Sequence, residues 1–267
     1  MLPTPCTSHV SFDTIYEPSE DSYLFLDTLS SASESLWLTT HFHPAANPSN
    51  STAPLIVEVG SGSGIVLSFV AANSLPILGR RDVLALATDV NRNACVATRE
   101  TATKAITDRQ GQDPTTPTTI KSTYIASLMA DLVSPLRPGS VDILLFNPPY
   151  VPTEELPRLP SATEQDEEAS EGLSRSARFE RESYLLSLTY AGGRDGMETT
   201  DRLVAAIPDI LAPRGVAYVL LCAQNRPVEV RERIRAWGGG WNAELVGSSG
   251  VQAGWEKLVI ARIWRDV

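Results

Sequence analysis

The chain has 267 residues, 42% of them hydrophobic and 20% charged, and its 32 acidic and 22 basic residues give a formal net charge of −10. This composition is typical of a globular protein and excludes collagen, a wholly disordered chain and a small disulfide scaffold. The acidic balance argues against a protein that binds nucleic acid mainly through phosphate contacts, since these need a surplus of Lys and Arg.

Cysteine and histidine usage gives no sign of a metal site. Cys6, Cys95 and Cys222 lie far apart without a CxxC pair, and there are three histidines, so neither a disulfide framework nor a Cys/His zinc site is expected.

The N-terminus lacks the pattern of a signal peptide, and no stretch is long and apolar enough for a membrane span. We expect a cytoplasmic protein, with the nucleus as an additional location.

The first 54 residues are expected to form a segment with one helix and one loop. Ser19 is a candidate N-cap, followed by Glu20 and Asp21 in the first turn, where the helix dipole favours acids. Residues 39–54, rich in Ser, Thr, Pro, Asn and His, predict a loop. Apolar side chains recur at a helical interval at Tyr23, Leu26 and Leu29.

Strands and helices alternate through the rest of the chain. The predicted strands are Leu55–Val59, Val83–Thr88, Ser122–Met129, Val141–Phe146, Gly215–Leu221, Ala243–Gly247 and Leu258–Trp264. The predicted helices are Ile65–Asn73, Arg92–Ala105, Phe179–Tyr190, Arg202–Leu211 and Val228–Trp237. This alternation predicts an α/β fold, a single doubly wound domain over residues 1–267 with a mostly parallel sheet covered on both faces. In such sheets ligands bind beyond the carboxyl ends of the strands.

A glycine-rich loop and two acids are predicted to meet at that edge. Gly60, Gly62 and Gly64 follow the first strand at alternate positions, which suits close backbone approach to a ligand or a simple strand-to-helix turn. The spacing excludes a P-loop. Asp89 ends the second strand, where a carboxylate either accepts from both ribose hydroxyls of a nucleoside or caps a helix. Asp131 follows the third strand, where it can accept from an exocyclic amine such as that of adenine.

The segment Asn147-Pro148-Pro149-Tyr150 closes the fourth strand at the same edge. Its two prolines remove backbone donors and leave carbonyl acceptors. The Asn147 amide oxygen and the Pro148 carbonyl can together accept both hydrogens of a planar NH₂ group, and Tyr150 can stack on a flat substrate. The segment therefore indicates a site that holds an amide or amine nitrogen with its lone pair facing an electrophile, rather than a mere turn.

Together, these motifs resemble the class I methyltransferases that use S-adenosylmethionine. The resemblance covers the seven predicted strands and implies a Rossmann-like sheet of order 3-2-1-4-5-7-6 with strand seven antiparallel. It implies that Glu58 and residues 60–64 lie near the methionine moiety, Asp89 at the ribose, and Asp131 with Leu132 at the adenine. The Asn-Pro-Pro-Tyr segment resembles that of methyltransferases of the glutamine amide and of exocyclic adenine or cytosine amines.

Three further segments resemble the short, eukaryotic-type release-factor glutamine methyltransferases: Tyr16 to Ser22, Ala191 to Gly196, and Gln252 to Glu256. In that family the first segment packs against the cofactor, which implies contacts from Tyr16 and from the Ser22 hydroxyl. Alone, the same segment is an ordinary capped start of a helix.

The resemblance also implies a substrate and a partner. That family methylates the glutamine of the Gly-Gly-Gln motif in the class-one translation termination factor, as the catalytic subunit of a heterodimer with a small zinc-binding activator. The activator docks along the third, edge strand, here 122–129. Tyr124, Ile125 and Leu128 are expected to be exposed there unless the activator or the chain's own loops cover them.

One stretch departs from the family, because the chain between Tyr150 and Ala191 is longer than expected. The insertion, residues 153–190, carries the acidic run 164–168 and is either a solvated surface element or a lid or docking element for a basic partner.

No His, Cys or Lys near Asn147 offers a general base, so catalysis is expected to rest on positioning and electrostatics. Two alternative activities are methylation of the N6 amine of DNA adenine and methylation of lysine in histones or other proteins. The acidic composition and the lack of a target-recognition domain argue against the first. An ammonium group suits the Asn-Pro-Pro-Tyr segment less well than a planar NH₂.

Overall fold

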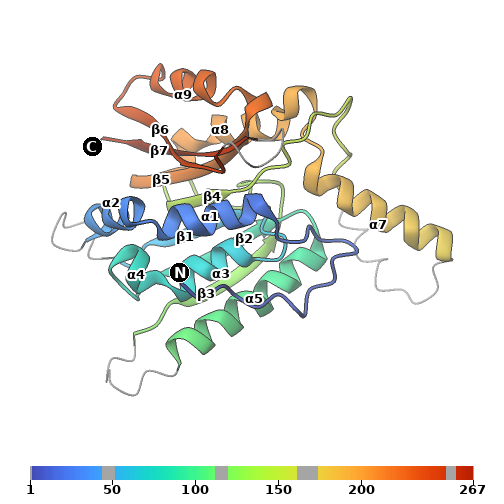
Figure 1. The fold of residues 1–267 in the computed structure, drawn as a ribbon, viewed down its shortest axis with the longest axis horizontal. Helices are drawn as coiled ribbons and strands as arrows, with labels where there is room; N and C mark the ends of the chain where they lie inside the picture. The colour runs from blue at the N-terminus through green and yellow to red at the C-terminus, as the bar shows by residue number, and fades with distance from the viewer. Residues whose placement is uncertain (1, 44–51, 112–119, 161–173, 251–256, 267) are drawn as a thin grey trace.

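The computed structural model describes residues 2–43, 52–111, 120–160, 174–250 and 257–266 (Figure 1). Its centre is a seven-stranded sheet of order β3-β2-β1-β4-β5-β7-β6. The pairs from β3 to β5 are parallel, and β7 runs antiparallel to both β5 and β6. The strands are β1 (Leu55–Val59), β2 (Leu84–Asp89), β3 (Thr123–Met129), β4 (Val141–Phe146), β5 (Leu211–Cys222), β6 (Trp241–Ser248) and β7 (Leu258–Arg265). The expected Rossmann-like order is confirmed.

Helices cover both faces of the sheet (Figure 1). On one face lie α1 (Glu20–Ser30), α2 (Ala32–Phe42), α3 (Ile65–Ala72), α4 (Ser74–Leu78) and α5 (Arg92–Gln110). On the other lie α8 (Glu198–Ile210) and α9 (Pro227–Arg235). Between β4 and α8, α7 (Arg175–Tyr190) projects from the body of the molecule (Figure 1).

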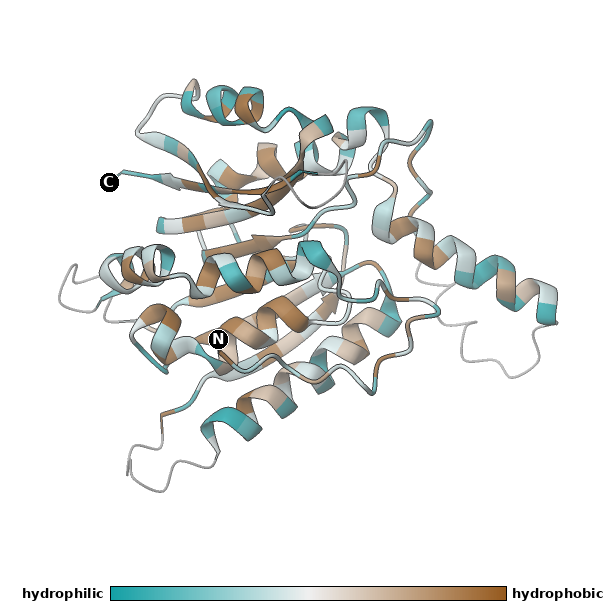
Figure 2. Ribbon diagram, viewed as in Figure 1, coloured by the Kyte–Doolittle hydropathy of each residue, from teal (hydrophilic) through white to brown (hydrophobic). Residues whose placement is uncertain are grey.

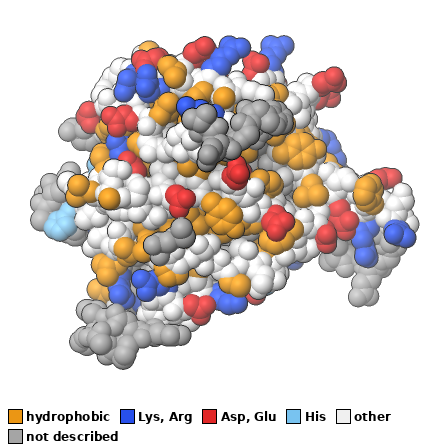
Figure 3. Space-filling view, viewed as in Figure 1, with side chains coloured by type: hydrophobic (Ala, Val, Ile, Leu, Met, Phe, Trp, Pro, Cys, Tyr) orange, Lys and Arg blue, Asp and Glu red, His pale blue; other side chains and the backbone are white. Residues whose placement is uncertain are grey.

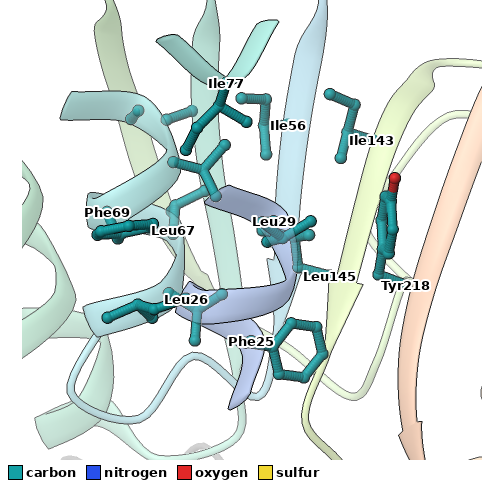
Figure 4. Close-up of a cluster of buried hydrophobic side chains, with 14 of the residues drawn as sticks. Phe25, Leu26, Leu29, Ile56, Leu67, Phe69, Ile77, Ile143, Leu145 and Tyr218 are labelled. Carbon is teal, nitrogen blue, oxygen red and sulfur yellow. The ribbon is translucent and has the colours of Figure 1, made fainter. Parts of the chain in front are cut away.

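The apolar sequence of β4 explains its central place. All of its residues are buried, and its side chains alternate between two hydrophobic cores. Ile143 and Leu145 pack on the side of α1 and α3 (Figure 4), whereas Leu144 and Phe146 pack on the side of α8. The hydropathy colouring shows the same inward concentration of apolar residues (Figure 2). A continuous apolar run is what a parallel strand covered on both faces requires.

The predicted loop at 39–54 is wrong at its start, because α2 continues to Phe42. This helix carries Glu34, which is buried and accepts hydrogen bonds from Arg262 of β7 at 2.8 and 3.0 Å. The Arg262 guanidinium also lies over the rings of Trp37 and Trp264. The ion pair with Arg262 compensates for burying the charge of Glu34. Because the two residues are far apart in the sequence, no local sequence pattern predicts this pair.

Other boundaries shift by a few residues. The helix predicted at Arg92–Ala105 extends to Gln110 as α5, α7 begins before Phe179, and α8 begins before Arg202. Neither α2 nor α4 was expected. Ser19 holds the N-cap position of α1, but its side chain makes no capping hydrogen bond. Tyr23 is exposed, whereas Leu26 and Leu29 are buried. On β3, Ile125 is exposed as expected, but Tyr124 and Leu128 are half-buried. Tyr124 packs against the hydrophobic core on the side of α3 and α5.

Several expectations fall on residues outside the described ranges: most of the loop at 39–54, the loop at 112–119, the acidic run 164–168 and the segment 252–256. Among the described helices, none has the length and apolar character needed to cross a membrane. Within the same ranges, no group of three or more His, Cys, Asp or Glu side chains is arranged to hold a metal ion.

Candidate active site

A cavity of about 370 Å³ opens at the carboxyl edge of the sheet, where β1 to β4 end. This volume is within the range of small-molecule sites. The segment before α1 closes one side of it, because Asn91 Nδ2 donates to the Thr14 carbonyl at 2.8 Å and holds that segment against the start of α5. The predicted site residues that line the cavity are Tyr16, Ser22, Glu58, Gly60, Gly62, Asp89, Asp131, Leu132, Asn147, Pro148, Pro149 and Tyr150.

The glycine loop is held by its neighbours. Gly60 N donates to the Thr88 carbonyl at 2.8 Å, and Gly62 N donates to Asp89 Oδ2 at 2.9 Å. From α5, the Thr98 hydroxyl donates to the Gly62 carbonyl at 3.2 Å. The end of β2 and α5 therefore fix the loop backbone that forms the floor of the cavity.

Gly64 has a different place from the other two glycines. It does not line the cavity but precedes α3 with φ +73°, a conformation that L side chains rarely adopt. A Cβ there would lie 2.7 Å from Thr98 Cα. Its contribution in this structure is close packing of the loop against α5, so a direct contact with a ligand remains only a prediction.

Two buried acids, Glu58 and Asp89, give the cavity its electrostatic character. Burial raises the pKa of Glu58 from 4.5 to about 8, the Leu67 amide that donates to it at 2.9 Å opposes this, and the nearby Asp89 raises it further. Burial also raises the pKa of Asp89, against hydrogen bonds from Gly62 and Asn91. A cation in this part of the cavity would favour the charged form of both carboxyls.

Glu58→Gln is expected to stabilise the ligand-free protein at alkaline pH. The folded-state pKa of Glu58 lies above its unfolded value, so between pH 4.5 and about 8 the folded state holds a proton that the unfolded state has released. The free energy of unfolding therefore falls as pH rises through this window. Glutamine cannot ionise, and its oxygen can still accept from Leu67 N. Thermal unfolding should show the variant's Tm gain growing to roughly several degrees between about pH 5 and about pH 9. A gain that does not depend on pH would contradict the assignment.

Asn147 lines the cavity, and a neighbouring acid holds its side-chain amide in one orientation. Its Nδ2 donates to Asp21 Oδ2 at 3.1 Å, whereas its buried Oδ1 has no hydrogen-bond partner among the described residues. Because a carboxylate only accepts, Asp21 fixes which way the Asn147 amide faces. The other Asp21 oxygen accepts from Ser22 N at 2.6 Å and from the Ser22 hydroxyl at 3.3 Å. Asn147 Oδ1 is therefore an oriented hydrogen-bond acceptor that can still take a donor.

Sequence reasoning missed two residues at this site. Asp21 was interpreted as a helix-dipole acid, although it lies within the Tyr16–Ser22 segment that pointed to the site. Arg202 of α8 lines the cavity and its Nη2 donates to Asp131 Oδ2, so Asp131 is already paired on one side. Arg202 was placed only as the start of a helix, and no spacing rule links it to β3.

The described part of the insertion forms an apolar wall beside Tyr150. Its members are Leu156, Pro157, Leu159, Leu185 and Leu188. The wall is tied together by the Tyr184 hydroxyl, which donates to the Arg158 carbonyl at 2.5 Å. The insertion therefore contributes to the cavity and is more than a solvated surface element.

No protein-family model matches the chain. Among curated proteins, it is 30% identical to mouse "Methyltransferase HEMK2" over 269 residues, covering 98% of this chain and 96% of that protein. It is also 30% identical to the Schizosaccharomyces pombe "eRF1 methyltransferase catalytic subunit mtq2" over 272 residues, covering 99% and 96%.

Among solved structures, the fold matches the E. cuniculi Mtq2–Trm112 complex "responible for the methylation of eRF1 translation termination factor" with a TM-score of 0.51. The identity is 20%, and the match covers 95% of this chain and 99% of that one. That likeness concerns the fold. The two full-length relatives, together with the strand order and the placement of the Asn-Pro-Pro-Tyr segment, show that the chain belongs to the HEMK2/Mtq2 family of methyltransferases.

Proposed function

We propose that this chain transfers a methyl group from S-adenosylmethionine to the side-chain amide nitrogen of the glutamine in the Gly-Gly-Gln motif of the class-one translation termination factor. The observation that carries the proposal is that Asn147 lines the cavity and that its buried Oδ1 has no hydrogen-bond partner among the described residues. The names of its relatives, which include an eRF1 methyltransferase catalytic subunit, support this choice. Such an activity belongs in the cytoplasm, where translation terminates.

The residues of the cavity fit S-adenosylmethionine, which when bound supplies an electrophilic methyl group on a sulfonium. Glu58 and the glycine loop would hold the charged methionine end, since that part of the cavity favours a cation. Asp89 would accept from the ribose hydroxyls, and Asp131 with Leu132 would contact the adenine. Tyr16 and Ser22 would close the cavity over the bound molecule.

The reacting nitrogen needs orientation more than activation by a base. Asn147 Oδ1 and the Pro148 carbonyl would accept both hydrogens of the glutamine NH₂, which turns the nitrogen lone pair toward the methyl group. The same two oxygens stabilise the positive charge that grows on nitrogen. Among the described residues that line the cavity there is no His, Cys or Lys, so the proton would leave to water after transfer. Pro149 and Tyr150 would shape the entrance for the glutamine side chain.

We also propose a partner at the free edge of β3. Ile125 is 49% exposed and Met129 is 45% exposed on this edge strand. An exposed apolar edge is a liability unless another chain covers it. The E. cuniculi relative was solved in complex with Trm112, and we assign the edge to a small zinc-binding activator of that kind, which makes this chain the catalytic subunit of a heterodimer.

Ile125→Lys is expected to weaken binding of the activator by about tenfold or more, because it places a charge in the centre of an apolar contact. Val228→Lys is the matched control, since Val228 is 55% exposed on α9, on the opposite side of the sheet from β3. Calorimetric titration of each variant with the activator checks this. Equal affinity for the two variants would place the partner elsewhere.

The proposed activity is tested with labelled S-adenosylmethionine and the co-expressed heterodimer. The acceptors are the termination factor, the same factor with the Gly-Gly-Gln glutamine changed to alanine, and an adenine-containing duplex. Label is expected on the first acceptor alone. Label on the duplex would instead support the adenine alternative.

The face in Figure 3, where Lys and Arg are interspersed with Asp and Glu, offers no concentrated basic area for a phosphate backbone.

A further inference from the structure

The residues after α7 form a turn that packs directly on the Asn-Pro-Pro-Tyr segment. Gly192 N donates to the Val151 carbonyl at 2.8 Å, and Val151 N donates to the Tyr190 carbonyl at 2.9 Å. A Cβ on Gly192 would lie 2.6 Å from the Pro149 carbonyl oxygen. The backbone that follows Asn147 is therefore seated against this turn, with no room for a side chain between them.

Gly196 makes the second close approach. It has φ +68°, and a Cβ there would collide with the Tyr150 carbonyl oxygen. The residue before it, Asp195, has φ +56°, an unusual conformation for a residue other than glycine. Glycine adopts this conformation without steric cost, whereas Asp195 does not, so a contact from outside the turn helps to hold Asp195 in place.

That contact comes from Asn225, just beyond the end of β5. Its Nδ2 donates to the Asp195 carbonyl at 3.0 Å and more weakly to the Gly196 carbonyl at 3.4 Å. Its Oδ1 accepts from Cys222 N at 2.8 Å, which anchors the side chain to the strand. Asn225 is 2% exposed, so each of these hydrogen bonds is shielded from water and costly to lose.

Asn225 does not line the cavity that holds Asn147. It lies instead at a separate groove of about 590 Å³, lined also by Arg194, Arg226 and Arg233. The chain of contacts runs from β5 through Asn225 to the 192–196 turn, and from that turn to the carbonyls of Pro149 and Tyr150. Any effect of Asn225 on the reaction must pass through the backbone of the Asn-Pro-Pro-Tyr segment.

We propose that Asn225 is a positioning residue for methyl transfer. It fixes the 192–196 turn, and the turn fixes the backbone that sets the Asn147 amide oxygen and the Pro148 carbonyl at the spacing needed to accept a planar NH₂ group. This inference rests on the proposed function. It implies that the acceptor pair at the end of β4 also depends on support from Asn225 at the end of β5.

Asn225→Asp is the sharpest test, because it keeps the oxygen that accepts from Cys222 N and removes the NH₂ that holds the turn. At neutral pH kcat is expected to fall by about tenfold to a hundredfold, with the cofactor Kd within about twofold of the wild type. At lower pH the introduced carboxyl becomes protonated and can donate again, so the ratio of variant to wild-type kcat is expected to rise. The exposed neighbour Gln224 provides the control, since Gln224→Glu makes the same chemical change without these contacts.

Gly196→Ala reaches the same backbone from the other side and is the second variant. It is expected to lower kcat with little change in cofactor Kd, because its Cβ displaces the Tyr150 carbonyl. Activity of the wild-type heterodimer on the termination factor is measured first, and its absence would contradict the proposed function rather than this inference. With an active wild type, an unchanged kcat in Asn225→Asp, or a parallel loss of kcat and cofactor affinity in both variants, would overturn the positioning role.

Discussion

Asn147→Ala is expected to lower kcat for methyl transfer by about a hundredfold to a thousandfold while cofactor affinity stays within about threefold of the wild type. The amide oxygen it removes is buried and unpartnered among the described residues, and the proposed glutamine NH₂ is the donor it lacks. The cofactor would be held mainly by Glu58, Asp89 and the glycine loop, none of which bonds to Asn147.

Asp21→Asn is the matched variant for this experiment. It leaves Asn147 in place but removes the carboxylate that orients its amide, so the oxygen and the NH₂ can exchange places. An intermediate loss of kcat is expected, smaller than that of Asn147→Ala. Single-turnover rates and cofactor titrations on both variants separate the two quantities. Equal losses of rate and of cofactor affinity would show that Asn147 acts on the cofactor and not on the acceptor nitrogen.

Asp89→Ala is expected to have the opposite signature, with cofactor Kd raised by about a hundredfold and kcat at saturating cofactor within a few-fold of the wild type. Each hydrogen bond to a carboxylate is worth about 1.5–3 kcal/mol, and two ribose hydroxyls would donate to Asp89. The substitution also removes the acceptor of Gly62 N, which in the wild type donates to Asp89 Oδ2 at 2.9 Å. The glycine loop therefore loses one of its supporting hydrogen bonds.

Calorimetric titration with S-adenosylmethionine measures the loss of affinity directly. Asp209→Ala serves as the control, because Asp209 is an exposed acid on α8 and does not line the cavity. An Asp89→Ala protein that binds the cofactor as tightly as the wild type would refute the ribose contact and with it the orientation assigned to the cofactor.

Much of the fold could be predicted because its signals are local. The β4 residues form one continuous apolar run, and the glycine loop and Asp89 mark where β1 and β2 end. Since parallel strands end at one edge, the sequence also predicted that these residues and the Asn-Pro-Pro-Tyr segment would meet. The structure brings them together around one cavity, apart from Gly64.

The parts that could not be predicted depend on contacts between distant residues. Asp21 and Asn147 are 126 positions apart, and the Glu34–Arg262 pair that anchors α2 spans 228 positions. Periodicity and capping rules act within a few residues, so they cannot assign a partner to a polar side chain at such separations. The same reason hides the contact between Arg202 and Asp131, and the clamp that Asn225 forms on the Asp195 carbonyl.

The central claim is that the Asn147 acceptor pair holds a planar amide nitrogen. The most direct test is tandem mass spectrometry of the termination factor after incubation with the heterodimer and S-adenosylmethionine, with fragments that place the methyl group on a single residue. A methyl group on the side-chain nitrogen of the Gly-Gly-Gln glutamine, absent with Asn147→Ala, is the predicted result. A methyl group on lysine, or a glutamine methylated equally well by Asn147→Ala, would contradict the account.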